Sequence, residues 1–207
     1  MLRPVAANTD AGPLFAASHS PHGDPTIWTY LPDGPYESVE HLRIMLEWAS
    51  SSNDPLYFTL TSLPDERPQG IASYLRIAPD IGSIEIGHIW FGPQLKRTTA
   101  ATEAIYLLAR HAFDELGYRR LEWKCNALNV ASRRAAERFG FTYEGLFRKH
   151  QIVKGRNRDT AWFSITDNEW PAIRGGFQAW LAPENFNSAA QQKRPLGELI
   201  GRARDGA

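Results

Sequence analysis

A basic loop that leads into a helical pattern is the first feature of this sequence that could do chemistry. Lys96 and Arg97 follow a strand-like run that ends at Phe91, and the helical pattern begins at Thr98. The first N–H groups of a helix have no intrahelical acceptor and lie at the positive end of the helix dipole, so this loop suits a diphosphate. An ordinary solvent-exposed helix start explains the same residues, so the spacing alone leaves both interpretations open.

The strand before this loop carries the first candidate for proton transfer, Glu85. Strand alternation places Glu85, Gly87 and Ile89 on one face and His88 and Trp90 on the other. A carboxylate in this position could take a proton from a reacting group, or it could be a cross-strand partner for a lysine or arginine. His88 lies on a largely apolar face, which favours a hydrogen-bonded core histidine.

The elements that must position these residues follow from periodicity and turn residues. Helical patterns cover 10–18, 38–51 behind a serine cap, 98–116, a short segment capped by Asn129, and 169–181. Strand-like runs cover 56–62, 70–77, 83–91, 120–125, 143–153 and 158–165, the last two forming a hairpin over 154–157. The apolar stripe of the third helix is Ala101, Ile105, Leu108, Ala112 and Leu116.

Two shorter elements have a predicted inner face. In 120–125 we expect Leu121, Trp123 and Cys125 to face one way and Glu122, a reserve proton acceptor, to face the other. In the short helix we expect Ala131, Ala135 and Phe139 on one face.

This order of elements predicts a mixed α/β sheet with helices on both faces, because strands joined through a helix run parallel. We expect a single domain over 1–181 and a C-terminal extension over 182–207. The extension is either a surface helix or a loose tail, and packing on a second subunit of a homodimer is one interpretation of it.

Composition argues against several classes of partner. Lysine plus arginine equals aspartate plus glutamate at 23 each, so no basic field would hold nucleic acid or an anionic membrane. Cys125 is the single cysteine, which excludes an intrachain disulfide and a multi-cysteine zinc cluster, and we predict no metal. Residues 1–20 lack a secretory pattern and no run approaches the length of a membrane span, so we expect a cytoplasmic protein.

Four motifs in register resemble the GNAT superfamily of acyl-CoA N-acyltransferases, in particular its RimJ/RimL-like branch. These are Glu85-Ile-Gly87 followed by Ala101-Thr-Glu-Ala104, Asn129-Val-Ala-Ser132, Gly140-Phe141, and Glu144-Gly145 with Arg148. The resemblance covers about 83–165. It implies a mostly antiparallel sheet of about six or seven strands with one splayed parallel pair.

The resemblance also implies acetyl-CoA as co-substrate and a role for each matching position. The strand through Ile89 would hold the pantetheine arm by its backbone, and the start of the helix would hold the pyrophosphate. The implied cofactor contacts are His88, Ile89, Trp90, Lys96, Arg97, Thr98, Thr99, Ala100, Ala101, Asn129 and Ser132. Glu85 would be the base, and Ser132 would protonate the leaving thiolate.

Two departures from the family pattern stand out. The usual glycine-rich loop is replaced by Arg97-Thr-Thr-Ala100, so we expect the backbone to approach phosphates at ordinary φ angles, with threonine hydroxyls as extra donors. The tyrosine that many members use as the acid is Ala136 here. Ser132 takes that role in our hypothesis, although a capping hydroxyl explains it equally well.

The acceptor side is expected at the early segments and the final hairpin. Trp28 and Tyr30, with Glu85, are our candidate acceptor-binding residues; an ordinary aromatic core is the alternative for the two aromatics. We also note Tyr36, and the hairpin cations Lys154, Arg156 and Arg158, which would suit an acidic acceptor or simply form a solvated turn.

The functional hypothesis is an N-acetyltransferase that transfers the acetyl group of acetyl-CoA directly to a primary amine. The amine would belong to a protein N-terminus or a small molecule. The alternatives are a non-catalytic acyl-CoA-binding or sensor module and a scaffold that binds no CoA.

Overall fold

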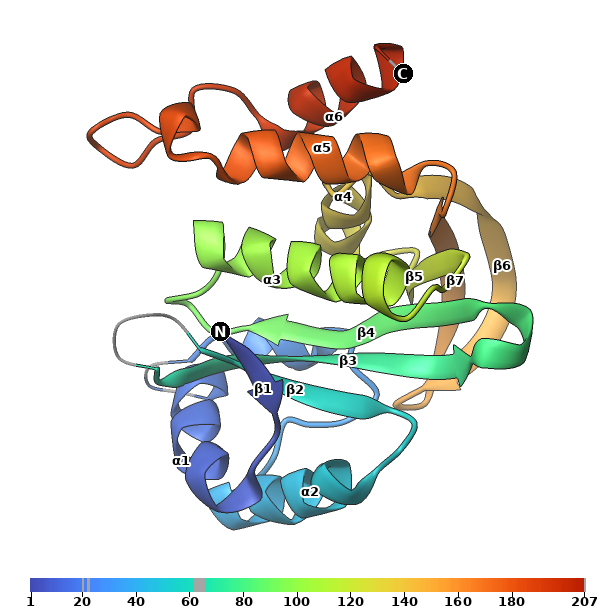
Figure 1. Ribbon diagram of the computed structural model, residues 1–207. Coiled ribbons are helices and arrows are strands. Elements are labelled where there is room, and N and C mark those ends of the chain that lie inside the picture. Colours follow the sequence, from blue (N-terminus) through green and yellow to red (C-terminus); the bar gives the residue numbers. More distant parts are fainter. Residues whose placement is uncertain (20, 22, 62–65, 207) are drawn as a thin grey trace. The chain divides into compact units, whose positions relative to one another are not determined.

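The chain folds as a mixed α/β protein around a seven-stranded sheet in the order β1-β2-β3-β4-β5-β7-β6. The computed structural model describes residues 1–19, 21, 23–61 and 66–206 (Figure 1). Ser20, Ser62 and Ala207, which ended three of the segments considered above, lie outside the described residues. One pair of neighbouring strands is parallel, as the sequence pattern predicted.

The observed elements match the predicted ones closely, with β1 as an addition that periodicity missed because it has only three residues. The strands are β1 Leu2–Pro4, β2 Leu56–Thr61, β3 Pro68–Ala78, β4 Ser83–Phe91, β5 Arg120–Asn126, β6 Thr142–Val153 and β7 Arg156–Thr166. The helices are α1 Ala7–Ser18, α2 Val39–Ser51, α3 Thr99–Arg110, α4 Val130–Arg138, α5 Trp170–Leu181 and α6 Leu196–Asp205. Short 3-10 turns cover Pro25–Thr29, Pro79–Ile81 and Pro183–Asn185. None of the helices within the described residues is both long enough and apolar enough to cross a membrane.

The chain divides into two compact units. The N-terminal unit comprises 1–78 and 85–104, and the C-terminal unit comprises 79–84 and 105–207. The N-terminal unit therefore holds residues 1–78, most of β4 and the start of α3.

In the N-terminal unit, β1, β2 and β3 pair antiparallel, and α1 and α2 pack on β3 and β2 (Figure 1). The predicted serine cap is confirmed, because Ser38 Oγ accepts the N–H of His41 at 3.2 Å. Apolar side chains from both helices and the strands form one core that includes Leu14, Leu42 and Ile71.

The buried carboxylate of Asp10 joins three segments of this unit. It is fully buried on α1, forms an ion pair with Arg3 of β1, and accepts the Thr59 hydroxyl of β2 at 2.6 Å and the Ala6 N–H at 2.9 Å. Burial raises the pKa of Asp10, but these hydrogen bonds together outweigh burial and hold the pKa below its usual value. Asp10 is therefore ionised and fixes β1 and β2 against α1.

The helix predicted over 98–116 begins as expected, at the start of α3, but its last turns differ from the prediction. Ala101, Ile105 and Ala112 of the predicted stripe are buried, whereas Leu116 is 50% exposed, so its assignment to the stripe was wrong. A π-helical turn, His111–Glu115, follows α3 and rotates the face that a regular helix would have kept inward.

In the C-terminal unit, β5, β7 and β6 pair antiparallel. The predicted inner face of β5 is confirmed, because Leu121, Trp123 and Cys125 are all buried. The predicted face of α4 is wrong in part, since Ala136 is fully buried while Ala131 is exposed. The final hairpin turns within two residues, Lys154 and Gly155, both at positive φ, and not over the longer predicted loop.

The C-terminal segment ends in a packed helix. Leu196, Leu199 and Ile200 of α6 are buried, and α6 lies along α5 at a glycine, Gly176 (Figure 1). A β-carbon at Gly176 would lie 2.5 Å from Ile200 Cγ1 and 2.8 Å from Ile200 Cα. The close approach of the two helices therefore depends on glycine at this position.

We predict that Gly176→Ala lowers the free energy of unfolding by about 1 to 3 kcal/mol, because the new methyl group overpacks the contact between α5 and α6. Gly175→Ala is the matched control on the same helix, since a β-carbon there meets nothing within 4 Å. That control should be neutral or stabilising by up to about 1 kcal/mol, as alanine is the better helix former. Urea denaturation of both variants measures the difference, and equal effects would contradict the packing argument.

Candidate functional site

The segment between β4 and α3 forms a tight loop that ends in a capped helix start. Gly92 N–H donates to the Gln69 carbonyl at 2.6 Å, and the Gly92 carbonyl accepts the N–H groups of Leu95 and Lys96, each at 3.0 Å. Thr98 Oγ1 accepts the Ala101 N–H at 3.2 Å, so Thr98 is the N-cap of α3. The loop is thus a built structure that presents the first turn of α3.

Arg97 corrects one expectation about this loop. Its φ is +61°, in the left-handed region that costs a non-glycine residue about 1 kcal/mol. The expectation of ordinary φ angles in this loop is therefore wrong at Arg97.

The first turn of α3 suits an anionic group. Thr99 and Ala100 are in the first turn of α3, and the residues four positions before them lie outside the helix, so their N–H groups have no partner within it. Arg97 and Thr99 are exposed, which leaves this helix end accessible. The N–H groups, the helix dipole and the Arg97 charge together fit a diphosphate.

Lys96, a predicted cofactor contact, forms an ion pair within the protein. Its Nζ forms an ion pair with Asp24, which precedes the 3-10 turn at 25–29. Lys96, together with the hydroxyl and N–H of Thr26, lowers the pKa of Asp24 to about 2. Asp24 therefore counters the Lys96 charge, and the ion pair ties the loop to the segment that carries Trp28.

Glu85, the predicted base, is buried and forms a cross-strand ion pair. Its Oε2 accepts from Arg76 on β3 at 2.7 Å, and its side chain is 4% exposed. This is the alternative that the strand pattern left open. The pairing gives Glu85 a structural role in joining β3 to β4.

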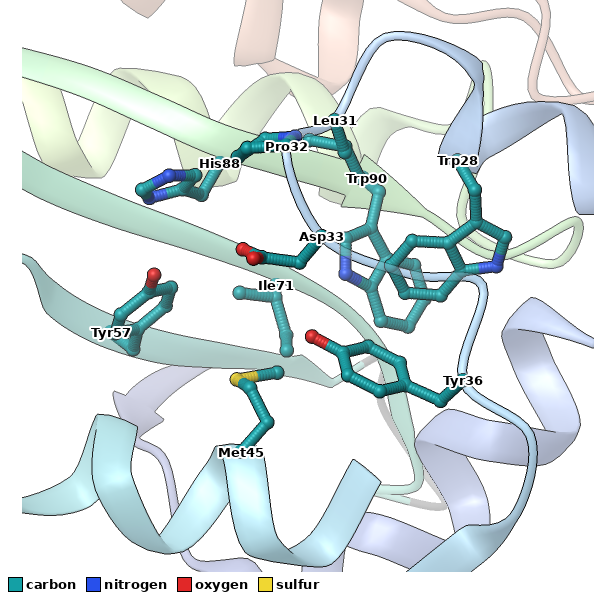
Figure 2. Close-up of a pocket in the computed structure, with 10 residues that line it drawn as sticks. All are labelled: Trp28, Leu31, Pro32, Asp33, Tyr36, Met45, Tyr57, Ile71, His88 and Trp90. Atoms are coloured by element: carbon teal, nitrogen blue, oxygen red, sulfur yellow. The ribbon is translucent and has the colours of Figure 1, made fainter. Parts of the chain in front are cut away.

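A pocket of about 310 Å³, partly open to solvent, lies within the N-terminal unit (Figure 2). Its walls come from the connection between α1 and α2, from α2, and from β2, β3 and β4. The lining residues are Trp28, Leu31, Pro32, Asp33, Tyr36, Met45, Tyr57, Ile71, His88 and Trp90. Trp28 was predicted as an acceptor-binding residue and lines the pocket; Tyr30 and Glu85 are not among the described residues that line it.

Trp28 organises the wall formed by the connection between α1 and α2. Its indole is buried, donates to the Ser18 carbonyl at 3.2 Å, and contacts the rings of Tyr36 and Trp90 at centroid distances of 5.4 and 5.8 Å. Gly34 has φ +63°, and a β-carbon there would lie 2.4 Å from the Trp28 ring. The chain therefore passes directly over the indole before it reaches Tyr36.

His88 lies at the opposite end of the pocket from Trp28 (Figure 2). Its φ is +48°, its Nδ1 is 3.2 Å from Ser73 Oγ, and its ring stacks on Tyr57 at 5.4 Å. The predicted hydrogen-bonded histidine is thus observed, but it is half-buried at a pocket wall and not enclosed in the core. The sequence did not predict that His88 lies at a pocket wall, because segments distant in the chain form the pocket surface.

Asp33 and Tyr57 were missed altogether by the sequence argument. Asp33 is on the connection between α1 and α2, and its carboxylate points into the pocket between the two aromatic ends (Figure 2). Burial first, and then the charge of Asp33, raise the pKa of Tyr57 to about 12 and raise the pKa of Tyr36 as well. The pocket is therefore apolar in its lining and negative in its electrostatic bias.

The second predicted group of site residues is in the C-terminal unit. Asn129 caps α4 by accepting the Ser132 N–H at 3.1 Å, and Ser132 Oγ accepts from Trp123 Nε1 at 3.0 Å. Burial raises the pKa of the Cys125 thiol, and a hydrogen bond with Ser132 partly offsets that effect. Ser132 is thus held between Trp123 and Cys125, and Ala136 offers no hydroxyl at the position of the family's tyrosine.

No group of three or more His, Cys, Asp or Glu side chains within the described residues is arranged to hold a metal ion. The candidate site is therefore built from a helix start, a strand and an aromatic pocket.

Residues 1–142 match the family described as the acetyltransferase (GNAT) domain. The chain belongs to this family and is an acetyltransferase, and the family uses acetyl-CoA. No curated protein sequence matches the chain.

Among solved structures, the chain is similar to a GCN5-related N-acetyltransferase from Brucella melitensis. The two are 49% identical over 97% of this chain and 90% of that one, with a TM-score of 0.93. A GNAT-family structure from Chromobacterium violaceum ATCC 12472 is 39% identical over 82% of this chain and 84% of that one, with a TM-score of 0.75. An acetyltransferase-like structure from T. thermophilus is 27% identical over 87% of this chain and 93% of that one, with a TM-score of 0.77.

We predict that Gly34→Ala destabilises the protein by about 2 to 4 kcal/mol, because the substitution combines left-handed strain with a clash against Trp28. The matched control is Gly155→Ala, at φ +71° with nothing within 4 Å of the added β-carbon, which should cost about 1 kcal/mol from strain alone. Chemical denaturation followed by tryptophan fluorescence measures both values. Equal losses in the two variants would show that the Trp28 contact does not constrain the pocket wall.

Proposed function

We propose that this acetyltransferase belongs to the RimJ/RimL-like branch and transfers the acetyl group of acetyl-CoA directly to a primary amine held in the aromatic pocket. The single observation that carries the proposal is the course of β4. His88 and Trp90 on β4 line the pocket, and the same strand continues into the loop and helix start that fit a diphosphate. One continuous segment of one unit thus serves both substrates in this proposal.

Residues of this segment would hold acetyl-CoA. The N–H groups of Thr99 and Ala100, with the Arg97 side chain, would bind the diphosphate, and the β4 backbone from His88 to Trp90 would bind the pantetheine arm. Thr98 contributes by capping the helix, as its Oγ1 is already used by the Ala101 N–H. Asn129 and Ser132 remain proposed contacts from the C-terminal unit.

The reaction requires a neutral amine, so a group at the pocket must accept a proton. His88 is favoured over Glu85, because His88 lines the pocket whereas Glu85 Oε2 is paired with Arg76. An imidazole exchanges protons near neutral pH. The amine nitrogen then bonds to the acetyl carbonyl carbon and releases a proton as the C–S bond breaks. The thiolate of CoA takes up a proton from Ser132, the proposed donor, and the proton released by the nitrogen restores the serine hydroxyl.

Direct transfer is favoured over an acetyl-cysteine intermediate. Cys125 is buried, and burial raises the pKa of its thiol, so the nucleophilic thiolate form is disfavoured. An amine that attacks the thioester itself needs no such nucleophile.

We predict that Arg97→Glu and Thr99→Asp each weaken acetyl-CoA binding at least tenfold in calorimetric titration, because each places negative charge against the diphosphate. An acidic residue in the first turn favours the helix, so weaker binding by Thr99→Asp would not reflect loss of α3. Arg202→Glu, on an exposed position of α6, is the control for net charge and should bind as wild type. Unchanged affinity in both loop variants would exclude this helix start as the diphosphate site.

We also predict intersecting initial-velocity lines when acetyl-CoA and the amine are varied together, as a ternary complex requires. Cys125→Ser should retain the wild-type pattern and rate. Parallel lines, or an acetylated Cys125 detected by mass spectrometry after incubation with acetyl-CoA alone, would rule out direct transfer.

A further inference from the structure

We infer that the acceptor is a compact amine with a single positive charge and an aromatic or branched apolar body, and that Asp33 selects its ammonium group. This inference rests on the proposed function, in that the aromatic pocket is taken as the acceptor site. It goes further by assigning the substrate class and a specificity residue.

The shape of the lining favours an aromatic or branched apolar body. Trp28, Tyr36 and Trp90 form one cluster of rings, and Tyr57 with His88 forms a second (Figure 2). Met45 and Ile71 lie between them. Rings in such a lining contact a ligand ring in offset or edge-to-face arrangements and also attract a cation to their faces.

The charge of the pocket favours a cation and disfavours an anion. Asp33 is the single carboxylate among the described lining residues, and its charge adds to burial, the larger cause, in raising the pKa values of Tyr36 and Tyr57. A carboxylate whose negative potential reaches both phenols also stabilises an ammonium group placed between them. An acidic acceptor, which the hairpin cations suggested from the sequence, would be repelled here.

The number of charges favours a monoamine over a polyamine. An ammonium group taken out of water is stabilised most strongly by a carboxylate, and a polyamine brings several ammonium groups at wide spacing. Among the described lining residues only Asp33 supplies a carboxylate. The hollow is bounded by ten described side chains, which favours a short ligand over a peptide segment.

The test is calorimetric titration of the full chain, with and without CoA, using 2-phenylethylamine, the neutral isostere 2-phenylethanol, and spermidine. We expect 2-phenylethylamine to bind most tightly. Asp33→Asn should weaken its binding about tenfold, the effect of losing one charge-assisted contact, and should leave 2-phenylethanol binding unchanged. Glu37→Gln is the matched control, since Glu37 is a carboxylate four residues further along with a side chain 86% exposed, and it should bind as wild type.

A second variant changes the shape of the pocket and leaves the charge of Asp33 in place. Met45→Trp adds a ring to a half-buried position on α2 and should abolish binding of both phenyl ligands while acetyl-CoA binding persists. Thermal melting of each variant confirms that the fold is retained.

The outcomes separate this inference from the proposed function. Thiol release from acetyl-CoA that is faster with spermidine or a peptide amine than with 2-phenylethylamine would overturn the inference and leave the transferase standing. Tight, Asp33-dependent binding of 2-phenylethylamine with no thiol release would contradict the proposed function and retain the ligand class. Equal binding by wild type and Asp33→Asn would overturn the role of Asp33.

Discussion

The buried indole of Trp28 is the contact on which the candidate pocket depends. The connection between α1 and α2 has little regular structure, and a loop of this kind keeps its shape only where side chains anchor it. Trp28 supplies that anchor by donating to Ser18 and by packing between Tyr36 and Trp90. Because Gly34 passes directly over the ring, the loop brings Asp33 and Tyr36 to the pocket in one defined arrangement.

The strand β4 links this pocket to the loop that fits a diphosphate. Two residues along this path, His88 and Arg97, adopt left-handed φ values that glycine would adopt without strain. Such strain persists only where surrounding contacts over-determine the backbone, and it concentrates at functional sites. Here the contacts are the Ser73 and Tyr57 partners of His88 and the capping bonds of Thr98 that follow Arg97.

Two charged residues that the sequence analysis assigned to the functional site form ion pairs within the protein. Glu85 pairs with Arg76, and Lys96 pairs with Asp24. Both ion pairs join segments that lie side by side only after folding. At the pocket, the carboxylate of Asp33 comes from a loop and the imidazole of His88 comes from a strained strand position.

The sequence by itself determined the order and type of nearly all the elements, the inner face of β5, the capped starts of α2 and α4, and the helix start that fits a diphosphate. These features depend on local periodicity, capping side chains and turn residues, which are readable within a few positions of the chain. It also indicated the family, through four motifs that resemble those of the family and occur in register along the chain. Two of its errors, at Leu116 and Ala131, arose where a π-helical turn or the packing of a short helix changed the inward face.

Only the tertiary structure decided which side chains meet. The Asp24–Lys96 and Asp10–Thr59 contacts join residues far apart in sequence, and the pocket draws on the connection between α1 and α2, on α2 and on three strands. No local pattern marks Asp33 or Tyr57, because an exposed loop aspartate and a strand tyrosine are ordinary residues until the fold places them around one cavity. Pockets are made by non-local packing, and for that reason the candidate pocket came from the tertiary structure while the candidate diphosphate segment came from the sequence.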